Sequence, residues 1–152
     1  MINTTDAVRS LFIPVAGSNL VLPNAAVAEV VPYSEPEAVA DSPDWLLGKV
    51  SWRNQIIPLI SFEVAAGGVM PGPGVRSRIT VLNGITGNPK LPFYAVLTQD
   101  IPRLLKIDHS VIAPGSDTAA ATAVLTNVMI NGEPAQIPNL DALENMLQKV
   151  VS

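Results

Sequence analysis

Prolines and glycines interrupt this chain so often that they limit what it can fold into. Its 152 residues include 14 prolines and 10 glycines, spread along the whole length. Proline breaks the interior of a helix, whereas a sheet with many turns accommodates both residue types. Between them lie runs of strand length that are rich in Val, Ile and Leu. These runs are residues 10–15, 19–23, 48–52, 55–61, 78–82, 93–98, 101–107, 123–130 and 134–138. We therefore predict a mainly β fold, built as small barrels or as a sandwich.

Two of the connections are typical of tight hairpins. VAGSNL (15–20) contains Gly17, which can adopt a positive φ, and Asn131-Gly132 is a dipeptide favoured in two-residue hairpin turns. Pro14 and Pro58 fall inside predicted strands. Because proline has no N–H to donate to a neighbouring strand, we expect each of them at an edge or a bulge.

Residues 139–151 have a different pattern. Apolar residues recur there at helical spacing, and Asn139 is placed to cap the first turn. The apolar positions are Leu140, Leu143, Leu147 and Val150. We predict an amphipathic helix that docks on the sheet, with a partner-binding helix as the alternative.

The length favours one domain over residues 1–152. We expect residues 1–9 to form a flexible start. Residues 65–75, rich in Gly and Pro, are the expected seam between two halves of similar strand content. Residues 113–123 are small and weakly polar and predict a second loose segment.

Composition excludes several classes of protein. Hydrophobic residues make up 48% of the chain and charged residues 14%, which is typical of a folded domain that can leave apolar surface for a partner. The net charge is −4 and the basic residues are scattered, which argues against nucleic acid. The chain has no cysteine, which excludes disulfides and zinc–thiolate sites. We find no signal-peptide pattern and no stretch of about 18 apolar residues, so we predict a cytoplasmic protein without direct membrane insertion.

No catalytic constellation is visible. His109 lies beside Asp108 and Ser110, but neighbours on an extended strand point to opposite faces and cannot form a triad. One histidine and scattered carboxylates offer no dense metal-ligand set. PGPG (71–74) lacks the Lys-Ser/Thr of a phosphate loop. We therefore predict no catalytic, cofactor-binding or metal-binding residues and no enzymatic activity.

An acidic stretch without internal basic residues leaves two interpretations open. It is either a solvated loop or a surface that steers a basic partner. Its carboxylates are Glu35, Glu37, Asp41 and Asp44.

Several segments, in order, resemble the CheW-like domains of chemotaxis coupling proteins. LLGKVSWRNQIIPLISF (46–62) is similar to the family signature, in which a glycine and a short strand precede a turn with Arg-Gly and then a strand ending xxxPxxD. Residues 10–32 resemble the opening hairpin and the VxEI segment, here Val27, Glu29 and Val30. Residues 93–107 resemble the VDxVxxVxxI strand pair, and residues 123–147 the closing hairpin and helix.

The sequence departs from the family pattern at three places. Asn54 replaces the glycine after the arginine, Ser61 replaces the aspartate, and Pro102 falls in the strand that follows Asp100. Asn54 can still adopt a left-handed conformation. With these departures the sequence resembles a divergent accessory adaptor, such as the ChpC-type protein of the type IV pilus chemosensory system, more than a flagellar coupling protein.

The resemblance implies a fold and a function. The implied fold is two intertwined five-stranded SH3-like β-barrel subdomains with a hydrophobic seam and a C-terminal helix. The implied function is non-catalytic coupling of a methyl-accepting chemoreceptor tip to a CheA-type histidine kinase, without cofactors. A small-molecule sensor that uses the seam as its pocket is the alternative.

The resemblance also implies partner-binding residues. Arg53 and Glu29 match an ion pair beside the receptor groove, and Val27 and Gly48 match positions implicated in receptor or kinase contact. Trp52 is either an interface hot spot or a core residue. In the run 55–61, Ile56, Leu59 and Ile60 cannot all face one side of a strand, so we expect part of this run in a core and part in the seam.

Overall fold

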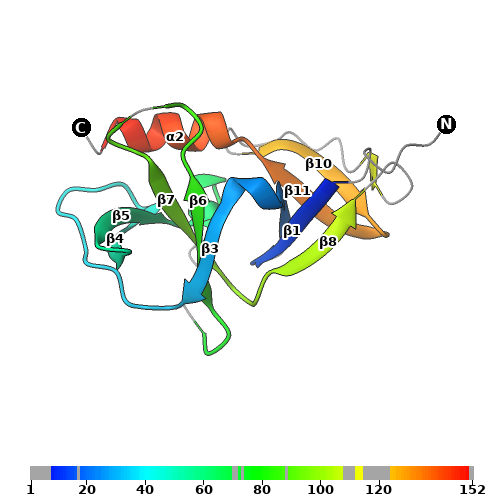
Figure 1. Ribbon diagram of the computed structural model, residues 1–152, viewed down its shortest axis with the longest axis horizontal. Coiled ribbons are helices and arrows are strands. Elements are labelled where there is room, and N and C mark those ends of the chain that lie inside the picture. The colour runs from blue at the N-terminus through cyan, green and yellow to red at the C-terminus, as the bar shows by residue number, and fades with distance from the viewer. Residues whose placement is uncertain are drawn as a thin grey trace.

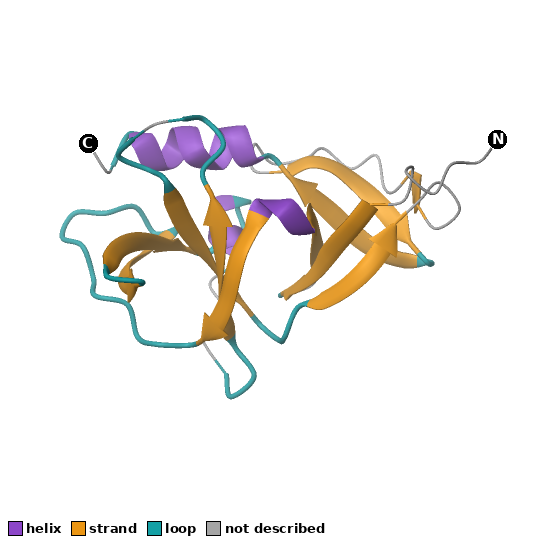
Figure 2. Cartoon of the chain, in the orientation of Figure 1, coloured by secondary structure: helices purple, strands orange, loops and turns teal. Residues whose placement is uncertain are grey.

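The structure is a computed structural model of the chain and describes residues 8–16, 18–69, 72, 74–87, 89–107, 112–114 and 124–150. Within them the chain forms two sheets, and helix α2 (Leu140–Gln148) lies along one side of the molecule (Figures 1 and 2). None of the helices in the described part of the chain is both long enough and apolar enough to span a membrane.

The larger sheet is formed by the first two and the last four strands of the described chain. Its strands lie in the order β8-β1-β2-β11-β10-β9. Their bounds are β1 (Val8–Val15), β2 (Ser18–Pro23), β8 (Arg103–Ile107), β9 (Ile112–Pro114), β10 (Val124–Ile130) and β11 (Glu133–Pro138). Only β2 and β11 pair in parallel; the other pairs are antiparallel.

The smaller sheet is formed by the middle of the chain. Its strands lie in the order β3-β6-β7-β5-β4, with β5 and β7 parallel. Their bounds are β3 (Val27–Pro32), β4 (Leu46–Trp52), β5 (Gln55–Ile60), β6 (Arg78–Asn83) and β7 (Phe93–Thr98). Two short helices accompany them, the 3-10 turn η2 (Asn24–Ala26) and α1 (Phe62–Ala65). The predicted mainly β fold of two intertwined halves with a C-terminal helix is thus confirmed, and short β9 adds a sixth strand to one half.

The chain crosses between the sheets at places that the sequence analysis did not mark. It leaves the larger sheet after β2, through Asn24–Ala26, and returns after β7, through residues 99–102. Residues 65–75, the expected boundary between the two halves, instead connect β5 to β6 within the smaller sheet. A glycine- and proline-rich composition marks a loose connection, and a loose connection can join two strands of one sheet.

Some expected boundaries also shift. Val8 and Arg9, expected in a flexible start, belong to β1 and pair with β8. Pro102 lies just before β8 and not inside it, so β8 loses no donor to proline. The predicted loose segment 113–123 lies outside the described residues except for Ala113 and Pro114 of β9. Pro14 pairs with β2 but lies outside the ladder between β1 and β8. Pro58 pairs with β4 but lies outside the ladder between β5 and β7.

Alternation along the strands produces three hydrophobic clusters. The first, here called the seam, lies between the sheets and under α2; its members include Ile13, Leu20, Ile60, Phe62, Tyr94, Leu143 and Leu147. The second lies inside the smaller sheet and includes Val50, Trp52, Ile57, Leu59, Ile79, Val81 and Leu97. The third lies inside the larger sheet and includes Phe12, Val21, Val128 and Ile130. Adjacent residues such as Phe12 and Ile13 therefore enter different clusters, as period-2 geometry requires.

Helix α2 is held to the seam by polar as well as apolar contacts. Asn139 accepts the N–H of Ala142 at 3.1 Å, which confirms the predicted cap. The carboxylate of Glu144, fully buried, accepts from the N–H of Ile85, from the N–H and hydroxyl of Thr86, and from the Tyr94 hydroxyl. Burial and the nearby Glu144 charge raise the pKa of Tyr94, so its hydroxyl remains a donor. The helix ends at Gln148, so Val150, expected on its apolar face, lies beyond it and is exposed.

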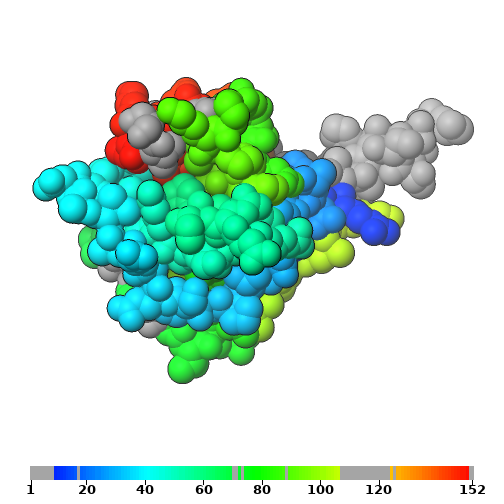
Figure 3. All heavy atoms as spheres, turned by 60° about the vertical axis from the view of Figure 1, so that its left-hand side comes forward, coloured from blue at the N-terminus to red at the C-terminus, as the bar shows by residue number. Residues whose placement is uncertain are grey.

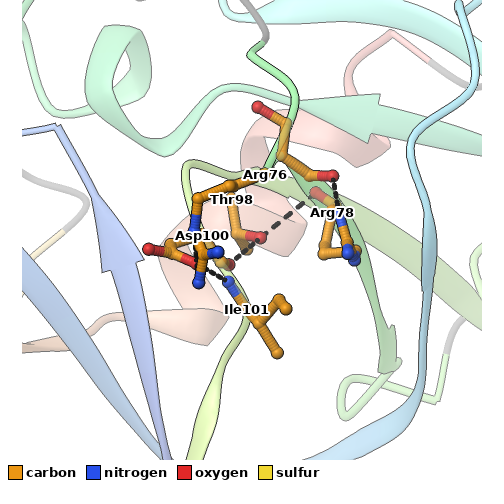
Figure 4. A network of polar contacts seen from close by, with 6 residues as sticks. Arg76, Arg78, Thr98, Asp100 and Ile101 are labelled. Carbon is orange, nitrogen blue, oxygen red and sulfur yellow. Dashed lines mark hydrogen bonds and ion pairs between the residues drawn. The ribbon is translucent and has the colours of Figure 1, made fainter.

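The return crossing from β7 to β8 is organised by a small polar network (Figure 4). The Thr98 hydroxyl lies 3.2 Å from the Arg78 carbonyl oxygen and 3.1 Å from that of Asp100. The Asp100 carboxylate accepts from Arg76 at 2.8 Å and from the N–H of Ile101. The hydrogen bond from Arg76, followed by that from Ile101, holds the pKa of Asp100 below its usual value.

Candidate partner-binding site at the closure of the smaller sheet

Side chains join the two edge strands of the smaller sheet. β3 and β4 stand at opposite ends of the strand order, so no backbone ladder connects them. Nevertheless, the Trp52 indole Nε1–H, at the end of β4, donates to Glu29 Oε1 on β3 at 3.0 Å. Arg53 Nη2, in the following turn, lies 3.1 Å from the same oxygen. The sheet thus curls until its edges meet, and we call Glu29, Trp52 and Arg53 the closure site.

A tight turn places Arg53 at this site. Trp52 pairs with Gln55, and the two residues between them have positive φ, 47° at Arg53 and 63° at Asn54. Positive φ at both central residues is the type I′ geometry, whose twist matches that of antiparallel strands. Asn54 therefore adopts the left-handed conformation expected of it. The same geometry recurs at Asn131 and Gly132 between β10 and β11, where the sequence predicted a hairpin.

The three side chains differ in exposure. The Trp52 residue is only 6% exposed, and its ring meets that of Phe93 edge to face with centroids 4.8 Å apart. The side chains of Arg53 and Glu29 are 63% and 42% exposed. The Arg53 guanidinium lies over the indole, 4.6 Å from its centroid. The site therefore presents an accessible charge pair on a buried aromatic base. Figure 3 shows this side of the molecule, where light-blue to teal spheres of β3, β4, β5 and residues 33–45 form much of the surface.

Val27 and Gly48 lie outside this cluster. Val27 is half-buried on β3, pairs with Leu82 and packs against the seam; a bulge separates it from Glu29. Gly48 is buried in β4 with φ 145°, and a Cβ there would lie 2.3 Å from the Glu37 carbonyl oxygen. Backbone hydrogen bonds of 2.8 and 2.9 Å between Glu37 and Lys49 hold this close approach. Glycine at position 48 is thus required by a contact within the chain.

Side chains of the run 55–61 alternate between the two faces of β5, and one of them lies at the surface. Leu59 enters the interior of the smaller sheet and Ile60 enters the seam. Ile56, the third apolar residue considered in this run, is 66% exposed. It faces the opposite side of the strand from Ile57 and Leu59, and it does not belong to the seam cluster. The result is an apolar side chain on the surface, two strand positions after the turn that carries Arg53.

The described residues offer little for a ligand-based function. They contain no group of three or more His, Asp or Glu side chains placed to hold a metal ion, and His109 lies outside them. A seam cavity lined by Ile13, Thr80 and Leu143 measures about 10 Å³, about the space of one water molecule. A second, open hollow of about 400 Å³ lies beside Ala16 and Glu63.

Comparisons with known proteins agree with this fold. Residues 9–148 match the CheW-like domain family. The structure is similar to the crystal structure of the scaffolding protein TtCheW from Thermoanaerobacter tengcongensis, with a TM-score of 0.72 and 21% sequence identity over 87% of this chain and 88% of that one. The search of curated proteins gave no significant match. Because the family match spans most of the sequence, the chain belongs to the CheW-like domain family.

Proposed function

We propose that this protein is a non-catalytic chemosensory adaptor that couples a methyl-accepting chemoreceptor tip to a CheA-type histidine kinase in the cytoplasm. The observation that carries the proposal is the exposed Arg53–Glu29 pair at the closure site of a CheW-like fold. The similar solved structure is itself described as a scaffolding protein, which supports the same role here.

The chemistry of the pair suits recognition better than stability. Exposed ion pairs contribute only about 0–1 kcal/mol to folding. Arg53 contacts Glu29 through one terminal nitrogen, and a guanidinium has five N–H donors, so further donors remain for carboxylates or carbonyls of a partner. Charges at the edge of an interface contribute mainly to specificity and to the rate of encounter.

The other proposed contact residues have different local roles. Val27, half-buried on the same strand as Glu29, can extend the contact surface. We propose that Gly48 acts indirectly, because it allows residues 36 and 37 to pack on β4 and shape that edge of the sheet.

We further propose an accessory role in a type IV pilus and twitching-motility pathway. The departures at Asn54, Ser61 and Pro102 support it. They also keep the local backbone: Asn54 takes the left-handed turn position, and Ser61 caps α1 by accepting the N–H of Val64 at 3.3 Å, as an aspartate would. A divergent adaptor can therefore retain the closure site.

Charge reversal at the pair tests the proposal. Arg53→Glu should leave the free energy of unfolding within about 1 kcal/mol of the parent. It should weaken binding of a purified chemoreceptor tip several-fold, since it removes a donor and places two like charges together. Adding Glu29→Arg should restore part of the loss if the receptor recognises the pair. Affinities at two salt concentrations separate the Coulombic share.

The chain offers a matched control. Arg103 pairs with Glu133 at 3.6 Å, lies over the Phe12 ring, and is similarly exposed on the other sheet. Arg103→Glu should leave receptor affinity unchanged. Equal effects of the two reversals would show that net charge and not the closure site determines binding. Unchanged affinity in folded Arg53→Glu would remove Arg53 from the receptor site.

A further inference from the structure

The closure site brings a hydrogen-bond donor and a guanidinium to one carboxylate oxygen. The Trp52 indole N–H and Arg53 Nη2 lie 3.0 and 3.1 Å from the same oxygen, Oε1 of Glu29. The same indole carries the Arg53 guanidinium on its face, 4.6 Å from the ring centroid. Trp52 thus contacts both members of the exposed pair, one through its edge and the other through its face.

Trp52 itself offers a partner little surface. It is 6% exposed, packs among the interior residues of the smaller sheet and meets Phe93 edge to face. A partner that docks on Arg53 and Glu29 would meet their polar atoms and almost none of the indole. An effect of Trp52 on binding would therefore be transmitted through the two side chains that it holds.

The molecule contains a natural comparison on its other sheet. Arg103 lies 4.9 Å from the centroid of the buried Phe12 ring, and its Nη2 lies 3.6 Å from Glu133 Oε2. This arrangement has the arginine, the glutamate and the aromatic base, but a phenyl ring has no N–H to direct at the carboxylate. The ion pair without the indole donor is the longer one, 3.6 against 3.1 Å.

We propose that Trp52 is a positioning residue that orients the Glu29 carboxylate and the Arg53 guanidinium for a partner. The inference rests on the proposed function for its binding readout only. An exposed ion pair normally samples several rotamers, and ordering them on binding costs free energy. A carboxylate fixed by a buried donor and a guanidinium fixed on a buried ring are ordered before the partner arrives, so that cost is reduced.

The first test needs no partner. The chain has two tryptophans, so an ¹H–¹⁵N spectrum contains two indole N–H signals, which Trp45→Phe assigns. Glu29→Ala should shift the Trp52 signal and accelerate its exchange with solvent, whereas Glu29→Gln, which keeps an acceptor oxygen, should change it less. Trp52→Phe should increase the mobility of the Arg53 guanidinium towards that of Arg103. An indole signal indifferent to Glu29→Ala would overturn the proposal, and neither Glu29 variant requires a change in the core.

The second test is a double-mutant cycle on receptor-tip affinity. Trp52→Phe keeps an aromatic ring and removes the donor, and it should weaken binding about three- to tenfold, the cost of ordering one side chain on binding. In a Glu29→Ala background, the same change should have little further effect. Trp45→Phe, in the seam, should change affinity in neither background.

The outcomes of the cycle are distinguishable. Equal weakening by Trp52→Phe in both backgrounds would show a general structural role and overturn positioning. If the parent protein does not bind receptor tips, the proposed function fails, and the spectra alone decide whether Trp52 orients the pair. If Trp52→Phe does not fold, the two Glu29 variants still decide it, because they report on the indole of the intact core.

Discussion

Glu144 and Glu29 both accept hydrogen bonds from distant parts of the chain, but they differ in burial. Glu144 on α2 is fully buried and accepts from the loop after β6 and from Tyr94. Glu29 on β3 is 42% exposed, accepts a hydrogen bond from Trp52 and forms an ion pair with Arg53. Each joins elements that no backbone ladder connects: Glu144 joins α2 to the smaller sheet, and Glu29 joins the two edges of that sheet.

Burial decides what each network contributes. A carboxylate removed from water costs several kcal/mol unless donors replace its hydration, and the donors in turn need the carboxylate. Loss of the Glu144 network is therefore a loss of folding free energy. Glu29 remains in contact with water, so its partners can separate at little cost to the fold. The exposed network sets the geometry of a surface, which is what a binding partner recognises.

The largest effect is expected when Glu144 is removed. Glu144→Ala would leave the N–H groups of Ile85 and Thr86 and the Tyr94 hydroxyl without their acceptor, and would also leave a gap under α2. We expect destabilisation of about 3–5 kcal/mol, the range for breaking a buried charged network. The matched exposed variant, Glu29→Ala, should cost less than about 1 kcal/mol. Urea denaturation measures both; similar values for the two variants would contradict the distinction by burial.

The sequence could have indicated Glu144 but not the Trp52 contact. The buried residues of α2 are Leu143, Glu144 and Leu147, and half-buried Leu140 extends the same face, so Glu144 is a charged residue in the middle of an apolar face, which is a visible anomaly. The hydrogen bond from Trp52 to Glu29 joins two edge strands, and its existence depends on how strongly the sheet curls. No local pattern encodes that curvature. Family resemblance brought Arg53 and Glu29 together, but it did not define what the indole does.

The fold was predictable where local rules act and less so elsewhere. Runs between prolines and glycines located most strands, and Asn131-Gly132 located its turn. Short elements such as α1 and β9 have too few residues to show a period. The crossings at 24–26 and 99–102 are within the usual length of a hairpin loop, so their length does not distinguish a change of sheet from a turn within one.

An intermediate effect, of opposite sign, is expected at Thr80. Thr80 is fully buried beside the seam cavity, and its hydroxyl has no hydrogen-bond partner within the described part of the chain. If buried polar groups in the seam stabilise only when they are satisfied, as Glu144 is, then Thr80→Val should stabilise the protein. Valine has nearly the same shape, and removing an unsatisfied hydroxyl recovers about 1 kcal/mol. A lower midpoint of urea denaturation in Thr80→Val would show that the hydroxyl has an acceptor after all.

The smallest effect is expected at Asp100, an exposed carboxylate paired with an arginine as Glu29 is. Its pKa in the folded protein is lowered, first by the hydrogen bond from Arg76 and then by the N–H of Ile101. A group whose folded pKa is depressed stabilises the fold at pH values above its unfolded pKa, about 3.9 for aspartate. That contribution decreases as the pH falls below about 5, and it is lost once the pH passes the folded pKa.

Asp100→Asn isolates this contribution, because asparagine keeps an acceptor oxygen and does not titrate. The melting temperature of the parent should exceed that of Asp100→Asn slightly near pH 7, and the difference should disappear in strong acid. High salt should reduce the difference at neutral pH, since both side chains of the pair are exposed and the ions screen them. A difference that is large, or that is unaffected by pH and salt, would mean that an exposed carboxylate can support the crossing from β7 to β8 as firmly as Glu144 supports α2. Burial would then not be what separates the structural glutamate from the one at the closure site.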